Sequence, residues 1–244
     1  MVRQPTIKDP KKRGTVEGSE LAQPSWAPGA LFYLFHVLLL QLLLYPYLGD
    51  TGESRNPWLL TATNVMVITA IAYTISAKKR QWLIAAVIGL PTVVLCWFHT
   101  GGLQWTVLIL TMLLYAYAIF LLIPHIFKTK IVGLEEVYAV TSAYVLIGLA
   151  WSHLYQAIDW LYPGSFHLAE AGIPDATLTW AQYLFFSFTT LTTLGYGDIA
   201  PSSVPAQSLA IVESVTGVIF IAVVVARAIA LFVYQTLFDE QARK

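Results

Sequence analysis

The residues best suited to do chemistry lie together in one short segment. It reads Phe185-Phe186-Ser187-Phe188-Thr189-Thr190-Leu191-Thr192-Thr193-Leu194-Gly195-Tyr196-Gly197-Asp198. Gly195 and Gly197 can adopt positive φ at little steric cost, so the backbone here can leave ordinary α and β geometry. The carboxylate of Asp198, which follows directly, concentrates cations. The segment therefore combines an unusual backbone conformation with a group that attracts cations.

Other kinds of catalytic or binding site have little support in the sequence. No nucleophile–base pair, phosphate-binding loop or pair of carboxylates accompanies the segment, so we expect no enzyme and no cofactor. Cys96 is the single cysteine, which excludes an intrachain disulfide. Fourteen Lys+Arg balance fourteen Asp+Glu, and this neutral composition argues against a nucleic-acid partner.

The composition predicts an integral membrane protein. Of the 244 residues, 57% are apolar and 11% are charged, whereas a soluble domain carries about 25% charged residues. A membrane-spanning helix needs roughly 20 apolar residues. Six runs have about this length: 29–48, 57–76, 81–98, 103–127, 137–158 and 207–238. A shorter apolar stretch, 178–191, has a length that suits a re-entrant helix.

The basic residues predict the orientation of these spans. With six spans, thirteen of the fourteen Lys and Arg fall on one side of the membrane, and Arg55 falls on the other. Lys and Arg gather in cytoplasmic loops. We therefore expect a multi-pass protein in contact with membrane lipid, with both termini in the cytoplasm, in a plasma membrane or a bacterial inner membrane.

The segment 185–198 resembles the pore signature of potassium channels, Thr-x-Gly-Tyr-Gly-Asp preceded by a Thr-rich pore helix. The resemblance covers about 137–238. Six spans with a pore between the last two also resemble the voltage-gated cation channel superfamily, here as a bacterial-type member without a charged fourth span. The resemblance implies an all-α membrane protein with six transmembrane helices. A re-entrant pore helix and a selectivity-filter loop would lie between the fifth and the sixth.

The resemblance also implies roles for individual residues. Backbone carbonyls of the filter would replace the water shell of K⁺, which is the conducted ion rather than a cofactor. Asp198 would lie at the outer mouth. The filter would comprise five residues, of which the first four bind K⁺: Thr193, Leu194, Gly195, Tyr196 and Gly197. The pore helix would contribute Thr189, Thr190 and Thr192, and its carbonyl end would stabilise a cation in the cavity.

The sixth run carries further candidate residues. Gly217 lies where many potassium channels have a glycine hinge, although close helix packing explains it equally well. We expect Glu213 to hydrogen-bond behind the pore helix, or else to face water above the hydrocarbon. We expect Arg227 to reach lipid headgroups. Five residues at i+3 and i+4 spacing could line the pore: Val218, Ile221, Ala222, Val225 and Ala226.

The resemblance to voltage-gated channels fails in the fourth run. A voltage sensor needs several Arg or Lys along this span, and residues 103–127 contain none. We therefore expect no steep voltage dependence. The predicted organisation has five parts: a disordered basic arm 1–28, a four-helix transmembrane domain 29–127, a cytoplasmic linker 128–136, a pore domain 137–238 and a cytoplasmic tail 239–244.

The expected function is passive, potassium-selective transport across a membrane by a homotetramer. Four chains are needed because one filter strand cannot surround an ion. Two alternatives stay open. A less selective cation channel would differ in its reversal potentials in potassium and sodium gradients. A non-conducting regulatory membrane subunit would show no ion flux in liposomes.

Overall fold

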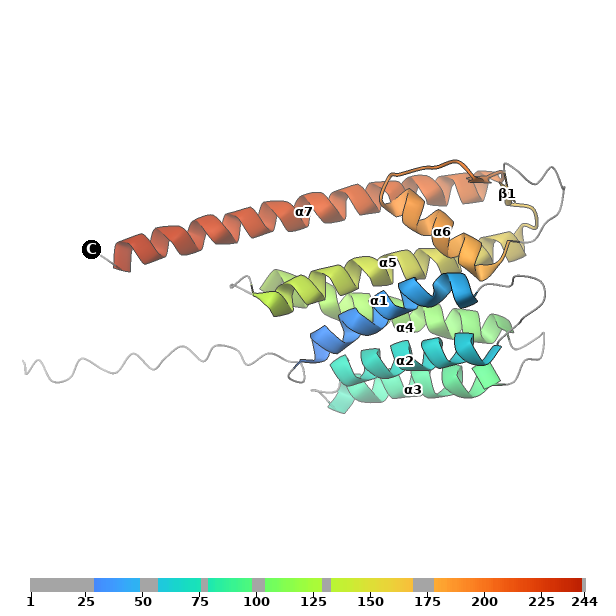
Figure 1. Cartoon of the computed structure of the whole chain (residues 1–244), viewed down its shortest axis with the longest axis horizontal. Coiled ribbons are helices and arrows are strands. Elements are labelled where there is room, and N and C mark those ends of the chain that lie inside the picture. The colour runs from blue at the N-terminus through green and yellow to red at the C-terminus, as the bar shows by residue number, and fades with distance from the viewer. Residues whose placement is uncertain are drawn as a thin grey trace, which may run out of the picture.

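The computed structural model describes residues 29–48, 57–75, 79–97, 104–128, 133–168 and 178–242. Within them the chain forms seven helices and two short strands (Figure 1). The helices are α1 (Ala30–Leu48), α2 (Pro57–Ile75), α3 (Lys79–Trp97), α4 (Gln104–Lys128), α5 (Leu134–Leu161), α6 (Trp180–Leu191) and α7 (Val204–Ala242). The basic arm 1–28, Arg55 and several other basic residues lie outside the described residues, so the predicted orientation stays a prediction.

The helices coincide with the apolar runs of the sequence to within a few residues. An α-helix satisfies all of its interior backbone groups internally, which is the conformation that a hydrocarbon environment requires. Three helices are long and apolar enough to cross a membrane: Trp105–Lys128, Leu134–Leu161 and Val204–Tyr234. In α1, α2 and α3 the described apolar stretches are shorter: Ala30–Leu44, Ala62–Thr74 and Arg80–Leu95.

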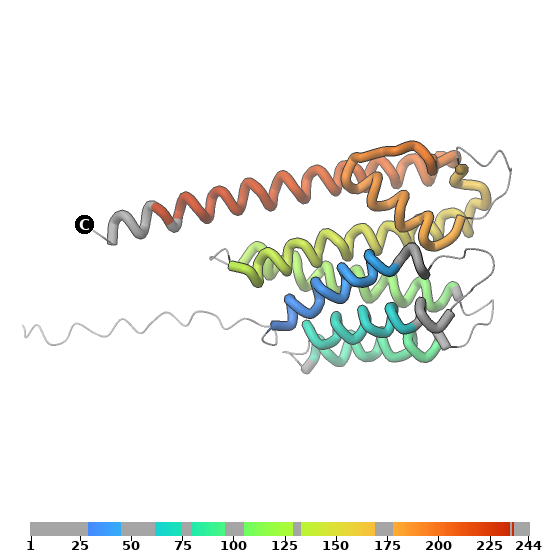
Figure 2. The backbone as a smooth tube through the Cα atoms, in the orientation of Figure 1, coloured from blue at the N-terminus to red at the C-terminus, as the bar shows by residue number. Residues whose placement is uncertain are grey.

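Helix α5 lies between two groups of helices (Figure 1). Helices α1 to α4 contact one another in sequence order, and α1 and α4 also contact α5. Helices α6 and α7 pack against the other side of α5 (Figure 2). A continuous apolar core joins the first group to α5; its fully buried members include Leu34, Leu38, Ile71, Leu114, Leu122 and Leu146.

A small β-ribbon amends the all-helical expectation. Strand β1 (Phe166–Leu168) pairs antiparallel with β2 (Ile199–Pro201), with Phe166 opposite Pro201 and Leu168 opposite Ile199. The ribbon joins the chain that follows α5 to the chain that directly follows Asp198. It therefore anchors the far end of the candidate filter to α5.

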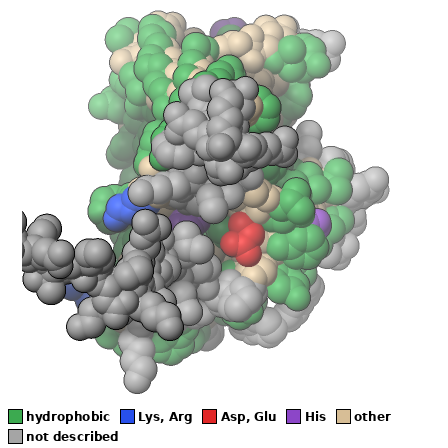
Figure 3. Space-filling model, turned by 90° about the vertical axis from the view of Figure 1, so that its left-hand side faces the viewer, with side chains coloured by type: hydrophobic (Ala, Val, Ile, Leu, Met, Phe, Trp, Pro, Cys, Tyr) green, Lys and Arg blue, Asp and Glu red, His purple; other side chains and the backbone are tan. Residues whose placement is uncertain are grey.

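Two helices extend past the limits predicted for the pore domain. Helix α5 begins at Leu134, inside the expected linker 128–136, and its first turn holds Glu135 and Glu136. Carboxylates stabilise the positive end of a helix dipole, which explains the earlier start. Helix α7 continues to Ala242, into the expected tail 239–244, and projects beyond the other helices (Figure 1). Viewed from the end of the molecule where the C-terminus lies, the described surface shows mostly hydrophobic side chains with a few charged ones (Figure 3).

Candidate functional site

Helix α6 confirms the predicted short helix in length and position. Thr179 is its N-cap, and a capping box joins it to Gln182: the Gln182 N–H donates to Thr179 Oγ1, and the Thr179 N–H donates to Gln182 Oε1 at 2.7 Å. Thr192 is the C-cap. The helix runs from one end of the molecule toward its middle, and the chain after it returns to the same end beside α7 (Figure 1).

The returning chain has an alternating backbone conformation. Thr193, Gly195 and Gly197 have positive φ of 58°, 58° and 87°, and Thr193 is the one non-glycine residue with positive φ in the described part of the chain. Leu194 and Tyr196, which lie between them, do not. The sign of φ therefore alternates along residues 193–197, which neither a regular helix nor a regular strand does.

The end of α6 accepts hydrogen bonds from the first three N–H groups of the segment 193–197. The Thr189 carbonyl accepts hydrogen bonds from the N–H groups of Leu194, at 2.8 Å, and Gly195, at 3.1 Å. The Thr193 N–H donates to Thr190 O at 3.0 Å. Among the described residues, no donor reaches the carbonyl oxygens of 193–197. The carbonyl oxygens of 193–197 thus have no hydrogen-bond donor in the described part of the chain.

These candidate filter residues lie on the surface of the single chain. Leu194 and Tyr196 are 57% and 63% exposed. The Tyr196 ring stacks on Phe185 of α6, with centroids 5.9 Å apart and planes at 4°. Asp198 is exposed beyond the filter. An apolar ring and a set of unpaired carbonyls at one surface are features of an incomplete site.

Gly217 allows α7 to approach the C-terminal end of α6. A Cβ atom at this position would lie 1.9 Å from Leu191 O, a contact that real Cβ atoms do not make. The same carbonyl accepts a hydrogen bond from the Tyr144 hydroxyl of α5 at 3.3 Å. Helix α7 is continuous through Gly217. The structure therefore favours close packing as the role of Gly217 over a hinge.

A fully buried polar cluster lies behind α6 and confirms the prediction for Glu213. Ser187 Oγ of α6 lies 2.6 Å from Glu213 Oε1 and 2.8 Å from Gly148 O of α5. Glu213 Oε2 contacts the Tyr155 hydroxyl, also of α5. Glu213, Ser187 and Tyr155 are each 0% exposed. Three helices are thus joined behind the candidate filter by one carboxyl group.

A second polar cluster joins the C-terminal end of α5 to α6 and to the chain after residue 198. Asp159, near the end of α5, accepts hydrogen bonds from the Tyr183 hydroxyl of α6 and from the Ser165 N–H at 2.8 Å. Ser165 O accepts from the Ser202 N–H at 2.7 Å. These contacts tie α5, α6 and the chain after the filter together.

Arg227 has a partner that the sequence did not indicate. Its guanidinium pairs with Glu136 in the first turn of α5, at 2.6 Å, and its reach to lipid headgroups stays a prediction. The guanidinium also lies 5.9 Å from the centre of the Phe127 ring of α4. The Arg227 and Glu136 side chains are 16% and 6% exposed, so the pair is largely buried. The pair holds the C-terminal half of α7 to the first turn of α5.

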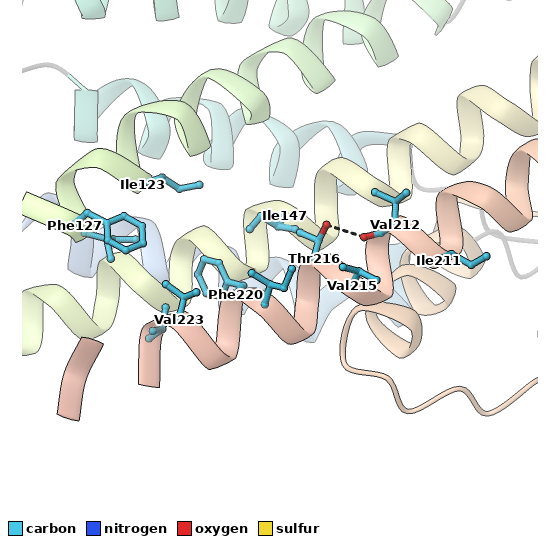
Figure 4. Close-up of a pocket in the computed structure, with 12 residues that line it drawn as sticks. Ile123, Phe127, Ile147, Ile211, Val212, Val215, Thr216, Phe220 and Val223 are labelled. Carbon is cyan, nitrogen blue, oxygen red and sulfur yellow. Dashed lines mark hydrogen bonds between the residues drawn. The ribbon is translucent and has the colours of Figure 1, made fainter. Parts of the chain in front are cut away.

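An apolar groove of about 470 Å³ is lined by residues of α4, α5 and α7 (Figure 4). The hydroxyl of Thr216, its one polar side chain, donates to Val212 O at 2.7 Å in its own helix. The lining comes from α4 (Ile123, Ile126, Phe127), α5 (Ile147) and α7 (Ile211, Val212, Val215, Thr216, Ile219, Phe220, Val223, Val224). The five residues predicted to line a pore are not among these, and they are exposed on α7.

Sequence reasoning singled out the candidate filter segment and Glu213 but missed most of the residues that they contact. Tyr155, Tyr183 and Asp159 lie on helices whose apolar sequence gives no indication of which polar residues meet. The sequence gives only a weak indication of their roles, which is that a tyrosine or an acid in an otherwise apolar helix needs a buried partner. Which partner it finds depends on the packing of the helices.

Comparison with known proteins agrees with this site. Residues 139–234, about two fifths of the chain, match the model of a family described as ion channel. The match extends from α5 through most of α7 and includes both polar clusters. No curated protein matches the chain. Ion channels are passive transporters and not enzymes, in agreement with the prediction. The match of residues 139–234 to this family, together with the long apolar helices, supports an integral membrane protein.

Proposed function

We propose that this chain is the subunit of a potassium-selective channel that works as a homotetramer. The observation that carries the proposal is the row of carbonyl oxygens at 193–197, which no donor in the described chain satisfies. Carbonyl oxygens bind a cation without fixed charge, so the ion can also leave. Asp198 beyond them attracts cations to the entrance. Thr193, Leu194, Gly195 and Tyr196 are the proposed K⁺ ligands.

Several copies of the chain are required to complete this site. One strand supplies oxygens on one side of an ion, whereas a dehydrated K⁺ must be surrounded. The exposed carbonyl strand and the exposed Tyr196 are consistent with a contact to other copies. Only 6% of the most apolar stretch of α7 is buried within one chain. Four copies around one axis would place this helix beside the ion path, with Val218, Ile221, Ala222, Val225 and Ala226 as candidate lining residues.

The proposed topology has six spans and a re-entrant α6. Helices α1, α2 and α3 each have 19 residues, and at 1.5 Å per residue they extend about 28 Å, close to the hydrocarbon thickness. They lie side by side with α4 and α5, which are long enough to span (Figure 2). Helix α6 with 12 residues reaches about 18 Å, which is half-way across. Its carbonyl end then points at the ion path.

Flux into liposomes tests the proposal. Purified protein should carry K⁺ down its gradient, and the reversal potential should follow K⁺ when Na⁺ replaces it on one side. In Gly197→Ala the added Cβ meets nothing within 4 Å, but φ is +87°. Within one chain the cost is therefore the backbone conformation, about 1–2 kcal/mol at each filter strand. This variant should assemble and lose K⁺ flux.

Each alternative predicts a different result. A less selective channel would give equal permeability to Na⁺ and K⁺. A regulatory subunit would give no flux from the wild-type protein. Flux from Gly197→Ala equal to that of the wild type would reject the filter assignment itself. A monomeric or dimeric mass, in a detergent that preserves flux, would reject the tetramer.

A further inference from the structure

The cluster behind α6 contains more hydrogen-bond contacts than its two hydroxyl groups can supply with protons. It has three close oxygen–oxygen contacts: Ser187 Oγ with Gly148 O, Ser187 Oγ with Glu213 Oε1, and the Tyr155 hydroxyl with Glu213 Oε2. A hydroxyl group has one proton, and a carbonyl oxygen can only accept. The hydroxyls of Ser187 and Tyr155 provide two protons for these three contacts.

We infer that Glu213 carries the third proton and is a neutral carboxylic acid that fastens α7 to α6. In this arrangement Tyr155 donates to Glu213 Oε2, Glu213 Oε1–H donates to Ser187, and Ser187 donates to Gly148 O. Every contact then has one proton. With an ionised Glu213, Ser187 must donate to the carboxylate, and its oxygen faces the Gly148 carbonyl oxygen at 2.8 Å with no proton between them.

The surroundings of Glu213 contain no charge that would balance a carboxylate. Helix α6 has no charged residue, and β2 has none. On α5 the titratable groups nearby are Tyr155, Tyr144, whose hydroxyl donates to Leu191 O, and Asp159, which accepts from Tyr183 of α6. His153 of α5 is also buried, but its ring contacts Tyr115 of α4 and the Leu149 carbonyl. On α7 the cation Arg227 lies fourteen residues away, about 21 Å along the helix, and pairs with Glu136. A buried carboxylate without an opposite charge nearby is unfavourable.

The proton on Glu213 then makes the geometry of the filter depend on pH, an inference that rests on the proposed function. The neutral acid holds α6 to both α5 and α7, and the end of α6 holds the filter strand through Thr189 O. Removing the proton releases the Ser187–Gly148 contact and leaves a charge behind the filter. We expect the conducting geometry to be lost as pH rises and the proton leaves Glu213.

Infrared difference spectroscopy of the purified wild-type oligomer tests the protonation directly. The wild type at neutral pH should show the C=O stretch of a protonated carboxyl group that is absent in Glu213→Gln. In Tyr155→Phe, the oxygen Oε2 loses its donor, so this band should move to higher frequency. The second variant identifies the band even if Glu213→Gln does not assemble. Neither measurement requires ion flux.

Flux measurements across a pH series test the consequence. Glutamine donates from its amide nitrogen and accepts at its oxygen, so it reproduces the neutral acid and cannot lose the proton. Glu213→Gln should therefore keep its K⁺ flux at alkaline pH, where wild-type flux falls. Ser187→Ala removes the hydroxyl that contacts both Glu213 and Gly148 O, and it should lower flux on the order of tenfold at every pH. The matched control is Ser214→Ala, whose hydroxyl donates to Ala210 O within α7; it should behave as the wild type.

The outcomes separate this inference from the proposed function. A missing Glu213 band in the wild type at neutral pH would overturn the inference even if the protein conducts K⁺. The band without any flux would support the protonated acid and reject the channel proposal. A Glu213→Gln variant that loses flux with rising pH as the wild type does would overturn the link to the filter.

Discussion

Substitution of Gly217 by alanine should destabilise the protein and close its conduction path. In a helix interior this change ordinarily stabilises by about 1 kcal/mol. Here the new Cβ would lie 1.9 Å from Leu191 O, so α6 and α7 must separate by more than about 1 Å. Overpacking of this kind costs about 1–3 kcal/mol, and a backbone neighbour cannot turn away as a side chain can. We expect a net loss of about 2 kcal/mol per subunit, or about thirtyfold in the folding equilibrium.

Three glycine-to-alanine variants make the reasoning quantitative. At Gly133 the new Cβ meets nothing within 4 Å, and the change should cost less than about 1 kcal/mol. At Gly148 it would lie 2.7 Å from the Phe188 ring, a side chain that can shift, so an intermediate loss is expected. Thermal unfolding and K⁺ flux should both rank Gly217→Ala lowest. A Gly217→Ala variant as stable as Gly133→Ala, with altered opening only, would refute close packing and restore the hinge.

Three further predictions address other parts of the chain. Steady-state activation curves in symmetric K⁺ should be shallow. Closing a channel with a 100 mV step needs roughly two to three moving charges, and the basic residues of α4 are only His125 and Lys128, in its last turn. A steep sigmoidal curve would contradict this. Replacing Arg227 with Met leaves Glu136 buried without its partner and should cost about 3–5 kcal/mol in unfolding experiments, with a smaller loss when Glu136→Gln is added. Tyr183→Phe removes the hydrogen bond to Asp159 and should lower stability by about 1.5–3 kcal/mol, measured by thermal unfolding.

The sequence predicted those features that depend on local residue types. Apolar runs fixed the helices to within a few residues, because a span must be apolar along its whole length. Gly195 and Gly197 predicted positive φ, and the structure has it at both positions. The positive φ of Thr193 was not predicted, because threonine rarely adopts it. That conformation follows from the alternation along the strand rather than from the residue itself.

The contacts between helices could not be predicted from the sequence. Ser187 lies within a predicted helix, but its neighbours Gly148 and Glu213 are 39 and 26 residues away. Their meeting depends on the rotation of each helix about its axis, and an apolar sequence constrains that rotation weakly. Arg227 shows the same difficulty. Its isolated position near a helix end suggested lipid headgroups, whereas the start of α5 at Leu134 brings Glu136 within reach.

Helix α5 explains how α7 can carry two ionisable residues through an apolar region. Glu213 meets Tyr155 in the upper half of α5, and Arg227 meets Glu136 in its first turn. Both contacts are buried, and both use the side of α7 that faces α5. The five residues of α7 proposed to line the ion path are all apolar and all exposed within one chain. If α7 moves when the channel opens, it must keep or exchange both contacts, since losing either leaves a polar group unpaired. Movement below Gly217 would break the Arg227 pair while leaving Glu213 in place.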